Sequence, residues 1–346
     1  MVKDSKASKD LWKCIRSLNP SQQEKAYELL NEDGVKTNNV SDICLQNSIH
    51  YGERKSFWNN TDQILSDLKE KVSSNIIPLN SLLLETVFRE DPVKLFEVFE
   101  SVELLFVVKS HILNFGKREA IRQTWGYVKQ LRIKIIFVLG HLHNMDHFAD
   151  LESKWHKDII QLNIEDKYEN LVYKTIYALL SLSKLNIRTE YVHCVDDDRL
   201  VNAINVYDIA RQNIAQSDTV MLGFMVNLSR PARSMTSKNY VSFEDYPFLY
   251  FPSYIIGGTI LTNMKTIHML SIGIQYVRLI HIEDVYIGMV ATAFKIEMRH
   301  HSGFLPFKKS VLMFSSYLSS PGYDHAYALL RDWTLIEQNE KINTKR

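Results

Sequence analysis

The spacing of apolar residues along the chain changes near residue 100. Residues 1–100 are polar and mostly helical in pattern, with turn signals such as Asp33-Gly34, so we expect a helical N-terminal region, either stem-like or docked. Further along, short apolar runs alternate with helical stretches, which is typical of an α/β sheet. We therefore predict an α/β domain over residues 101–315 and a C-terminal tail over residues 316–346.

The expected strands are short apolar runs: Val102–Val108, Ile133–Leu139, Tyr191–Val195, Met221–Val226 and Ile256–Asn263. The expected helices carry apolar residues at helical spacing: Arg118–Leu131, Asn170–Leu185 and one that starts near Asp284. Ligands of open α/β sheets bind outside the carboxyl ends of the strands. Candidate chemistry is therefore expected in the segments that follow the strands.

Composition narrows the class of protein. The 346 residues carry a net charge of +1, which provides no strong field for nucleic acid. No apolar run reaches the roughly 18–20 residues that a membrane helix needs, and the first residues contain no signal-peptide core. The cysteines Cys14, Cys44 and Cys194 are too few for a disulfide framework, although Cys14 and Cys44 could pair.

An acidic triplet, Asp196-Asp197-Asp198, directly follows the expected strand Tyr191–Val195. Successive side chains of a strand point to opposite faces, so Asp196 and Asp198 share a direction and Asp197 points elsewhere. Two converging carboxylates suit Mg²⁺ or Mn²⁺ and leave coordination positions for a substrate diphosphate. Acidic triplets also occur as solvated turns, but the position at a strand's carboxyl end favours a site.

Arg118 and Arg122 are four residues apart and lie on one face of the expected helix. Two guanidinium groups near a helix start suit a diphosphate, which they can contact with paired hydrogen bonds. A solvated basic helix face is the alternative and is the more common explanation of such a pair on its own.

Two further motifs are open to two interpretations each. Gly257-Gly258, between apolar runs and near Tyr254, predicts a close backbone approach or a turn with positive φ, and its aromatic neighbours suit a sugar ring. An ordinary turn into a core strand fits this segment equally well. Glu283-Asp284 begins an apolar helix, where acids are favourable N-terminal charges, yet it could also supply a general base.

Taken in order, these motifs resemble the inverting β-1,3-glycosyltransferase family, which includes β-1,3-galactosyltransferases, β-1,3-N-acetylglucosaminyltransferases and the more distant fringe enzymes. The resemblance covers about residues 102–305. It rests on the segments Val108-Lys109-Ser110, Arg118-x-x-Ile121-Arg122-x-Thr124-Trp125-Gly126, Phe137-Val138-Leu139-Gly140, Asp158-Ile159-Ile160, Tyr168-x-Asn170-Leu171-x-x-Lys174-Thr175, Asp196-Asp197-Asp198 with Val201-Asn202, Pro252-x-Tyr254-x-x-Gly257-Gly258 and Glu283-Asp284-Val285-x-x-Gly288.

The resemblance implies a GT-A-type fold, which binds nucleotide-diphospho-sugars. It also implies a metal-dependent inverting transferase that moves galactose or an N-acetylhexosamine from a UDP-sugar to a hydroxyl of a glycan acceptor, forming a β-1,3 linkage. The acceptor would be part of a glycoprotein or glycolipid. Family members are typically Golgi type II membrane proteins, so membrane association would require an anchor that is not seen in this chain.

The resemblance also implies residue roles. Asp196 and Asp198 would engage Mn²⁺ or Mg²⁺, and His300 or His301 would complete the metal shell. Asp284 is the favoured catalytic base, with Glu283 as its rival. The residues implied to bind the donor are Arg118, Arg122, Lys174 and Asp197. The residues implied to bind the acceptor or sugar are Tyr254, Gly257 and Gly258.

The chain also departs from the family pattern. Cys194 stands where a lysine is usual, and Arg199 stands where an apolar residue is usual. Ile255 and Val290 replace common cysteines, so the usual disulfides are expected to be absent, and Thr259-Ile260 replaces Gly-Tyr. These departures keep open a second hypothesis, a relative that binds nucleotide or glycan without turnover. A third hypothesis, a metal-dependent phosphohydrolase, would need more acids or histidines near the triplet.

Overall fold

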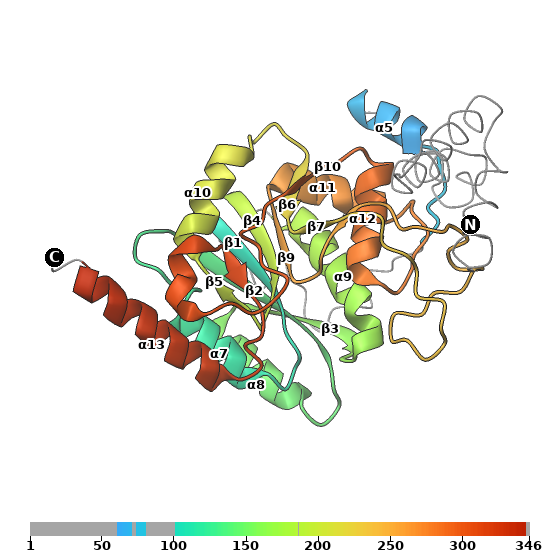
Figure 1. Ribbon diagram of the computed structural model, residues 1–346. Coiled ribbons are helices and arrows are strands. Elements are labelled where there is room, and N and C mark those ends of the chain that lie inside the picture. The colour runs from blue at the N-terminus through green and yellow to red at the C-terminus, as the bar shows by residue number, and fades with distance from the viewer. Residues whose placement is uncertain (1–60, 71–73, 81–100, 186, 344–346) are drawn as a thin grey trace, which may run out of the picture. The chain divides into compact units, whose positions relative to one another are not determined.

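The computed structural model describes residues 61–70, 74–80, 101–185 and 187–343 (Figure 1). The chain separates into two compact units, and each is described by itself: one contains helix α5 (Thr61–Lys69) and residues 226–253, and the other contains residues 78–225 and 254–346. Most of the predicted N-terminal region, including Cys14 and Cys44, lies outside the described residues. Its helical character therefore stays a prediction.

The larger unit is built on a seven-stranded sheet with the order β10-β6-β9-β4-β1-β2-β3. Its strands are β1 (Val102–Lys109), β2 (Ile133–His141), β3 (Ile159–Glu165), β4 (Thr189–Asp196), β6 (Val220–Gly223), β9 (Thr259–Thr262) and β10 (Glu297–His300). All neighbours are parallel except β9, which is antiparallel to β4 and β6. Short strands outside this sheet are β5 (Leu200–Val201), β7 (Met225–Val226), β8 (Tyr254–Ile255) and β11 (Ser319–Ser320). The predicted α/β class is confirmed.

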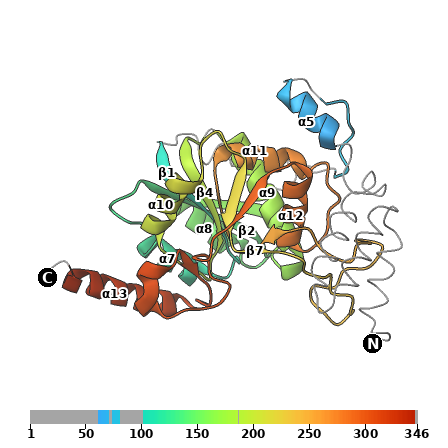
Figure 2. The same ribbon diagram turned by 45° about the horizontal axis from the view of Figure 1, so that its top comes forward.

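Helices cover both faces of this sheet (Figures 1 and 2). One face carries α9 (Leu171–Lys184), α11 (Met264–Gly273) and α12 (Glu283–Ala293), which contact one another. The other face carries α7 (Phe115–Gln123), α8 (Asp146–His156), α10 (Ala203–Asn213) and α13 (Ala326–Asn343). Two short 3₁₀ helices, η2 (Tyr168–Asn170) and η3 (Val311–Ser316), complete the set. No helix among the described residues is both long and apolar enough to cross a membrane.

Burial on both faces explains why the strands read as continuous apolar runs. In β1, Leu104, Phe106 and Val108 face the α7–α13 side, where they join one core cluster. Alternation along the strand then directs Val107 and Lys109 to the opposite face, which α9, α11 and α12 cover. Lys109 is therefore a charged residue that directly follows the apolar run Leu104–Val108 of this strand.

Two segments differ from the sequence expectation. Helix α7 ends at Gln123 rather than near residue 131, because the Thr124 and Gly126 N–H groups both donate to the Ile121 carbonyl. A Cβ on Gly126 would lie 2.2 Å from the Ile135 side chain, so the chain turns tightly here into β2. Residues 316–346, expected as a tail, contain β11 and α13, and α13 packs on α7 with its Leu329 and Ile336 buried.

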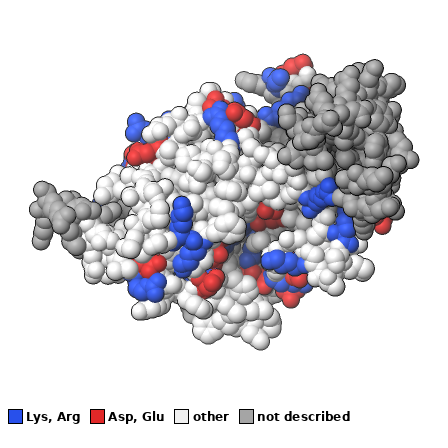
Figure 3. Space-filling view, in the orientation of Figure 1, with Lys and Arg blue, Asp and Glu red and all other residues white. Residues whose placement is uncertain are grey.

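Within the smaller unit, Arg233 organises the loop of residues 226–253. Its guanidinium donates to the carbonyls of Val241, Ser242, Tyr246 and Phe248 at 2.6–2.9 Å. On the face shown in Figure 3, acidic and basic side chains are interspersed in small groups, in agreement with the net charge of +1.

Candidate active site

The acidic triplet lies where β4 ends, at the carboxyl edge of the sheet. Asp196 is the last residue of β4, and its side chain is 34% exposed. Asp198 is half-buried, whereas Asp197 is buried. This alternation matches the predicted shared direction of Asp196 and Asp198.

Asp197 points into the protein instead. Its carboxylate accepts hydrogen bonds from Ser110 Oγ at 2.7 Å, Asn114 Nδ2 at 2.8 Å and Lys117 Nζ at 3.1 Å. These partners lie between β1 and the first turn of α7. Asp197 therefore fixes that connection, and its geometry favours this structural role over the predicted contact with the donor.

The Gly257-Gly258 turn joins the triplet to the acid pair. Gly258 has φ +82°, so the predicted turn with positive φ is present. Its carbonyl accepts the Asp196 N–H at 3.2 Å, and the Gly257 N–H donates to Asp284 Oδ2 at 3.2 Å. A Cβ on Gly258 would lie 2.4 Å from Asp196 Oδ2, so this turn also needs glycine for its close approach to the triplet.

The two acids at the start of α12 have different surroundings. Glu283 is buried: its carboxylate pairs with the Lys109 ammonium and accepts a hydrogen bond from Thr175 Oγ1 at 2.5 Å. Asp284 is half-buried, and its carboxylate accepts hydrogen bonds from the backbone N–H groups of Gly257 and Val285. Asp284 is thus the acid that is better placed to exchange a proton with a ligand.

Burial shapes the proton affinities at this edge of the sheet. Burial raises the pKa of Asp284, while the hydrogen bonds from Gly257 and Val285 oppose the shift. Burial also raises the pKa of Asp198, and the negative charge of Asp196 adds to this effect. A carboxylate with a raised pKa is a stronger proton acceptor, which suits a general base.

Lys109 connects the two acidic motifs. It lies opposite Asp196 in the parallel register of β1 and β4, and its Nζ is 3.2 Å from Asp196 Oδ1 while also pairing with Glu283. Burial would favour the neutral amine, but the charges of Asp196 and Glu283 prevail and raise the pKa of Lys109. No role was predicted for Lys109 from the sequence, although a lysine directly after the apolar run Leu104–Val108 is unusual.

Arg118 and Arg122 both pair with acidic side chains of the protein itself. Arg118 is fully buried and donates to both oxygens of Glu152, at 2.9 and 2.6 Å, and to the His111 and Ile112 carbonyls. Arg122 pairs with Asp158 and with Glu152. The guanidinium groups are used to hold α7, α8 and the start of β3 together. This geometry speaks against the donor-binding role predicted for both arginines.

Lys174 is likewise internal. It is 4% exposed, and its Nζ donates to the Ser110 carbonyl at 3.0 Å and to Asp166 Oδ1 at 2.5 Å. Asp166 in turn accepts the backbone N–H groups of Ile112 and Gly140. This buried ion pair ties α9 to the loop after β1, and the donor contact of Lys174 stays a prediction.

His300 and His301 do not group with the acidic triplet as a metal site. His300 ends β10, which is separated from β4 by β6 and β9, and its Nδ1 accepts the Met225 N–H at 3.2 Å. His301 lines a different cavity, of about 350 Å³, together with Asp208 and Tyr317. Among the residues that the structure describes, no three His, Cys, Asp or Glu side chains are grouped as a metal site. The predicted completion of the metal shell by His300 or His301 is not seen in this geometry.

The carboxyl groups alone still fit a cation. Five acids gather at this edge, Asp196, Asp197, Asp198, Glu283 and Asp284, against three cationic side chains, Lys109, Lys117 and Arg199. Carboxylate oxygens are ligands that suit Mg²⁺ or Mn²⁺. Asp196 and Asp198 are the two members of the triplet that are open enough to contribute such ligands.

Two departures from the family pattern now have structural descriptions. Arg199, which stands where an apolar residue is usual, is buried. Its guanidinium donates hydrogen bonds to the carbonyls of Leu305, at 3.2 Å, and of Gly257, at 3.5 Å. It thus ties the residue after the triplet to the glycine turn.

Cys194, which stands where a lysine is usual, is a free thiol on β4. Tyr254, the remaining predicted sugar contact, is half-buried in β8.

Comparison with known proteins identifies the family. A model of the family described as "Galactosyltransferase" matches residues 116–302. The chain is 30% identical over 243 residues to "Beta-1,3-galactosyltransferase brn" of Drosophila melanogaster, covering 68% of this chain and 75% of that protein. It is 27% identical to "Beta-1,3-galactosyltransferase bre-5" of Caenorhabditis elegans, covering 58% and 64%. It is also 27% identical to "UDP-GlcNAc:betaGal beta-1,3-N-acetylglucosaminyltransferase 7" of Mus musculus, covering 70% and 66%.

A solved structure of the galactosyltransferase LgtC with donor and acceptor sugar analogs covers 66% of this chain and 95% of its own, with 10% identity and a TM-score of 0.37; no conclusion rests on that likeness. The family match spans the sheet from α7 to β10 and includes both acidic motifs. The family expected from the sequence is confirmed: the chain belongs to the galactosyltransferase family and is a glycosyltransferase with an α/β fold.

Proposed function

We propose that this chain is a metal-dependent inverting transferase that moves galactose or an N-acetylhexosamine from a UDP-sugar to a hydroxyl of a glycan acceptor, forming a β-1,3 linkage. The observation that carries the proposal is the position of Asp284, a half-buried carboxyl joined through the Gly257-Gly258 turn to the carboxyl end of β4. The similarity to the fly and worm β-1,3-galactosyltransferases and to the mouse β-1,3-N-acetylglucosaminyltransferase supports the linkage and the choice of sugars.

Asp284 is assigned as the general base. An inverting transfer needs one group to take the proton of the acceptor hydroxyl as that hydroxyl attacks the anomeric carbon. Burial raises the pKa of Asp284, and its backbone donors hold the carboxylate in one orientation. Proton transfer by a positioned side chain contributes about 10²–10⁴-fold to a rate. Glu283 fits this role less well because Lys109 and Thr175 occupy its carboxylate.

Asp196 and Asp198 are assigned to hold Mn²⁺ or Mg²⁺. When bound, the cation would supply charge neutralisation for the departing diphosphate. Lys109 orients Asp196 from the neighbouring strand, and Asp197 fixes the loop beside the triplet. No covalent nucleophile is assigned, since direct attack by the acceptor accounts for inversion. We further infer that the protein acts on glycoprotein or glycolipid acceptors in the Golgi, as family membership suggests.

Single variants of the two acids at the start of α12, together with a control variant on α10, test this assignment. Asp284→Asn keeps the shape of the side chain but cannot accept the proton, so transfer is expected to fall by about 10²–10⁴-fold while UDP affinity in the presence of Mn²⁺ is unchanged. Asp208→Asn, which alters an exposed acid on α10, is the matched control and should leave transfer unchanged. Transfer would be followed by UDP release and affinity by titration calorimetry. Full transfer by Asp284→Asn, with transfer lost in Glu283→Gln, would assign the base to Glu283.

The hypothesis of a relative without turnover makes a different prediction. Such a protein would bind UDP with Mn²⁺ but release no UDP from any UDP-sugar, with or without an acceptor. Cys194, in the place of a usual lysine, is the observation that favours this alternative. The wild-type assay therefore separates the two hypotheses before any variant is made.

A further inference from the structure

The charged side chain that connects the two acidic motifs comes from outside both of them. Lys109 ends β1, is 9% exposed, and contacts Asp196 Oδ1 at 3.2 Å and Glu283 Oε1. Glu283 is 174 residues away along the chain, at the first position of α12. Lys109 therefore joins three elements: β1, the end of β4 and the start of α12.

A second set of contacts runs in parallel with this one. The Asp196 N–H donates to the Gly258 carbonyl, and the Gly257 N–H donates to Asp284. Asp196 and the acid pair are thus linked once through the backbone of the turn and once through the Lys109 ammonium. The backbone link consists of two hydrogen bonds of 3.2 Å. The side-chain link fixes Glu283, the residue next to Asp284.

We propose that Lys109 is the positioning residue that holds the acid pair of α12 against the carboxyl end of β4, and so sets where Asp284 stands relative to the triplet. The proposal rests on the function proposed above, because it takes Asp284 as the base. Lys109 acts through Glu283, whose carboxylate it fixes together with Thr175 of α9. A misplacement of about 1 Å in a catalytic group can cost on the order of 10²-fold in rate.

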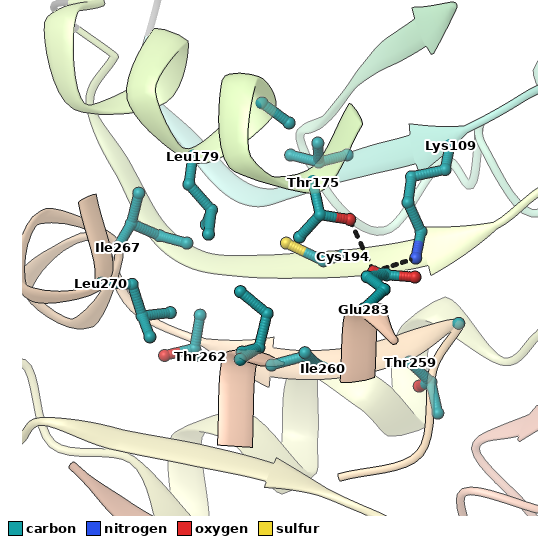
Figure 4. Close-up of a pocket in the computed structure, with 14 residues that line it drawn as sticks. Lys109, Thr175, Leu179, Cys194, Thr259, Ile260, Thr262, Ile267, Leu270 and Glu283 are labelled. Atoms are coloured by element: carbon teal, nitrogen blue, oxygen red, sulfur yellow. Dashed lines mark hydrogen bonds and ion pairs between the residues drawn. The ribbon is translucent and has the colours of Figure 1, made fainter. Parts of the chain in front are cut away.

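Cys194 supplies an independent way to test this. It precedes Asp196 by two residues on β4, so it points to the same face of the sheet. Figure 4 shows its sulfur beside Thr175 and Glu283, and these residues line a cavity of about 30 Å³ together with Lys109. A lysine at position 194 would extend through this cavity toward Glu283. The same carboxylate could then receive its cation from β4 instead of β1.

The experiment uses the full chain and measures kcat, donor KM and UDP affinity separately. Lys109→Met is expected to lower kcat by about 10²-fold and, because Lys109 also contacts the metal ligand Asp196, to weaken Mn²⁺-dependent UDP affinity by a smaller factor. Adding Cys194→Lys to Lys109→Met is expected to restore kcat by at least about tenfold. If Lys109 served stability alone, Lys109→Met would lower the melting temperature without lowering kcat more than it changes KM. Adding Cys194→Lys would then leave kcat at the value of the Lys109→Met single variant.

Thr175→Val is the second variant and keeps the proposal testable if Lys109→Met fails to fold. It removes the other hydrogen bond to Glu283 without changing charge, and it should lower kcat by roughly 3- to 10-fold with UDP affinity unchanged. Wild-type kcat in folded Lys109→Met, or in Thr175→Val, overturns the proposal. If the wild-type protein transfers no sugar at all, the proposed function fails instead, so the two failures are distinguishable.

Discussion

Replacing Arg118 by methionine tests whether α7 serves the fold or the donor. Met keeps much of the side-chain volume but removes all the hydrogen bonds of a fully buried guanidinium. Glu152, with a side chain only 9% exposed, would lose its paired contact with Arg118 and keep only that with Arg122. Breaking a buried ion pair by removing one partner costs about 3–5 kcal/mol.

Because Arg122 still pairs with Glu152, we expect the lower end of that range, about 3 kcal/mol of unfolding free energy. For a domain of this size each kcal/mol shifts the melting temperature by roughly 2–4 °C, so a fall of about 6–12 °C is expected. Urea unfolding followed by circular dichroism gives the free energy, and differential scanning fluorimetry gives the melting temperature. UDP affinity, measured well below the transition, should stay close to that of the wild type.

Arg132→Met is the matched control. Arg132 has a side chain 65% exposed and pairs with Glu103 at 3.8 Å, so its loss should change stability by no more than about 0.5 kcal/mol. The reasoning is refuted if Arg118→Met melts like the wild type and loses UDP binding. In that case the predicted donor contact of Arg118 would be right and the internal ion-pair network would be incidental.

Three further changes probe separate features. Burial lowers the pKa of His193 from 6.5 to about 3, so His193 takes up a proton in the unfolded chain before it does so in the folded protein as the pH falls. The free energy of unfolding should therefore be about 2 kcal/mol lower at pH 5 than above pH 6.5. Urea titrations above pH 6.5 and at pH 5 should show a smaller loss in His193→Gln. Gly258→Ala should cost about 1–3 kcal/mol because of its φ of +82°, whereas Gly257→Ala, with a Cβ 3.8 Å from Asp284, should cost clearly less; equal melting temperatures would contradict this. Asp198→Asn should abolish Mn²⁺-dependent UDP-sugar binding without unfolding the protein. Unchanged affinities in calorimetry would show that the triplet is a solvated turn and not a metal site.

All strands of the large sheet except β3 and β10 were predictable, because burial on both faces leaves a strong sequence signal. Val102–Val108 and Ile133–Leu139 are apolar except for Glu103 and Lys134, and both are strands within one or two residues of the expected bounds. The position of Asp196 followed from the rule that sites form at the carboxyl ends of strands, whereas the link of Gly258 and Asp284 to the same site was implied only by the family resemblance. The end of α7 was missed because it depends on Gly126 packing against Ile135, a contact between separate elements.

The partners of charged residues were less predictable. Sequence spacing places Arg118 and Arg122 on one helix face but does not reveal that Glu152 and Asp158 come to meet them from α8 and the start of β3. In the same way, nothing near Lys109 in the sequence indicates that Glu283, on a distant helix, is its partner. Such pairs depend on tertiary register, which a single sequence does not specify.

The central claim is tested most directly by product analysis with the purified wild-type chain. UDP-galactose and UDP-N-acetylglucosamine would each be incubated with a panel of β-galactoside and β-N-acetylhexosaminide acceptors, in Mn²⁺ or in excess EDTA, with UDP release measured and products examined by NMR. The account predicts release that requires both acceptor and Mn²⁺, with a new β-1,3 linkage in the product. UDP binding with no release from any donor, or a product with retained anomeric configuration, would contradict it.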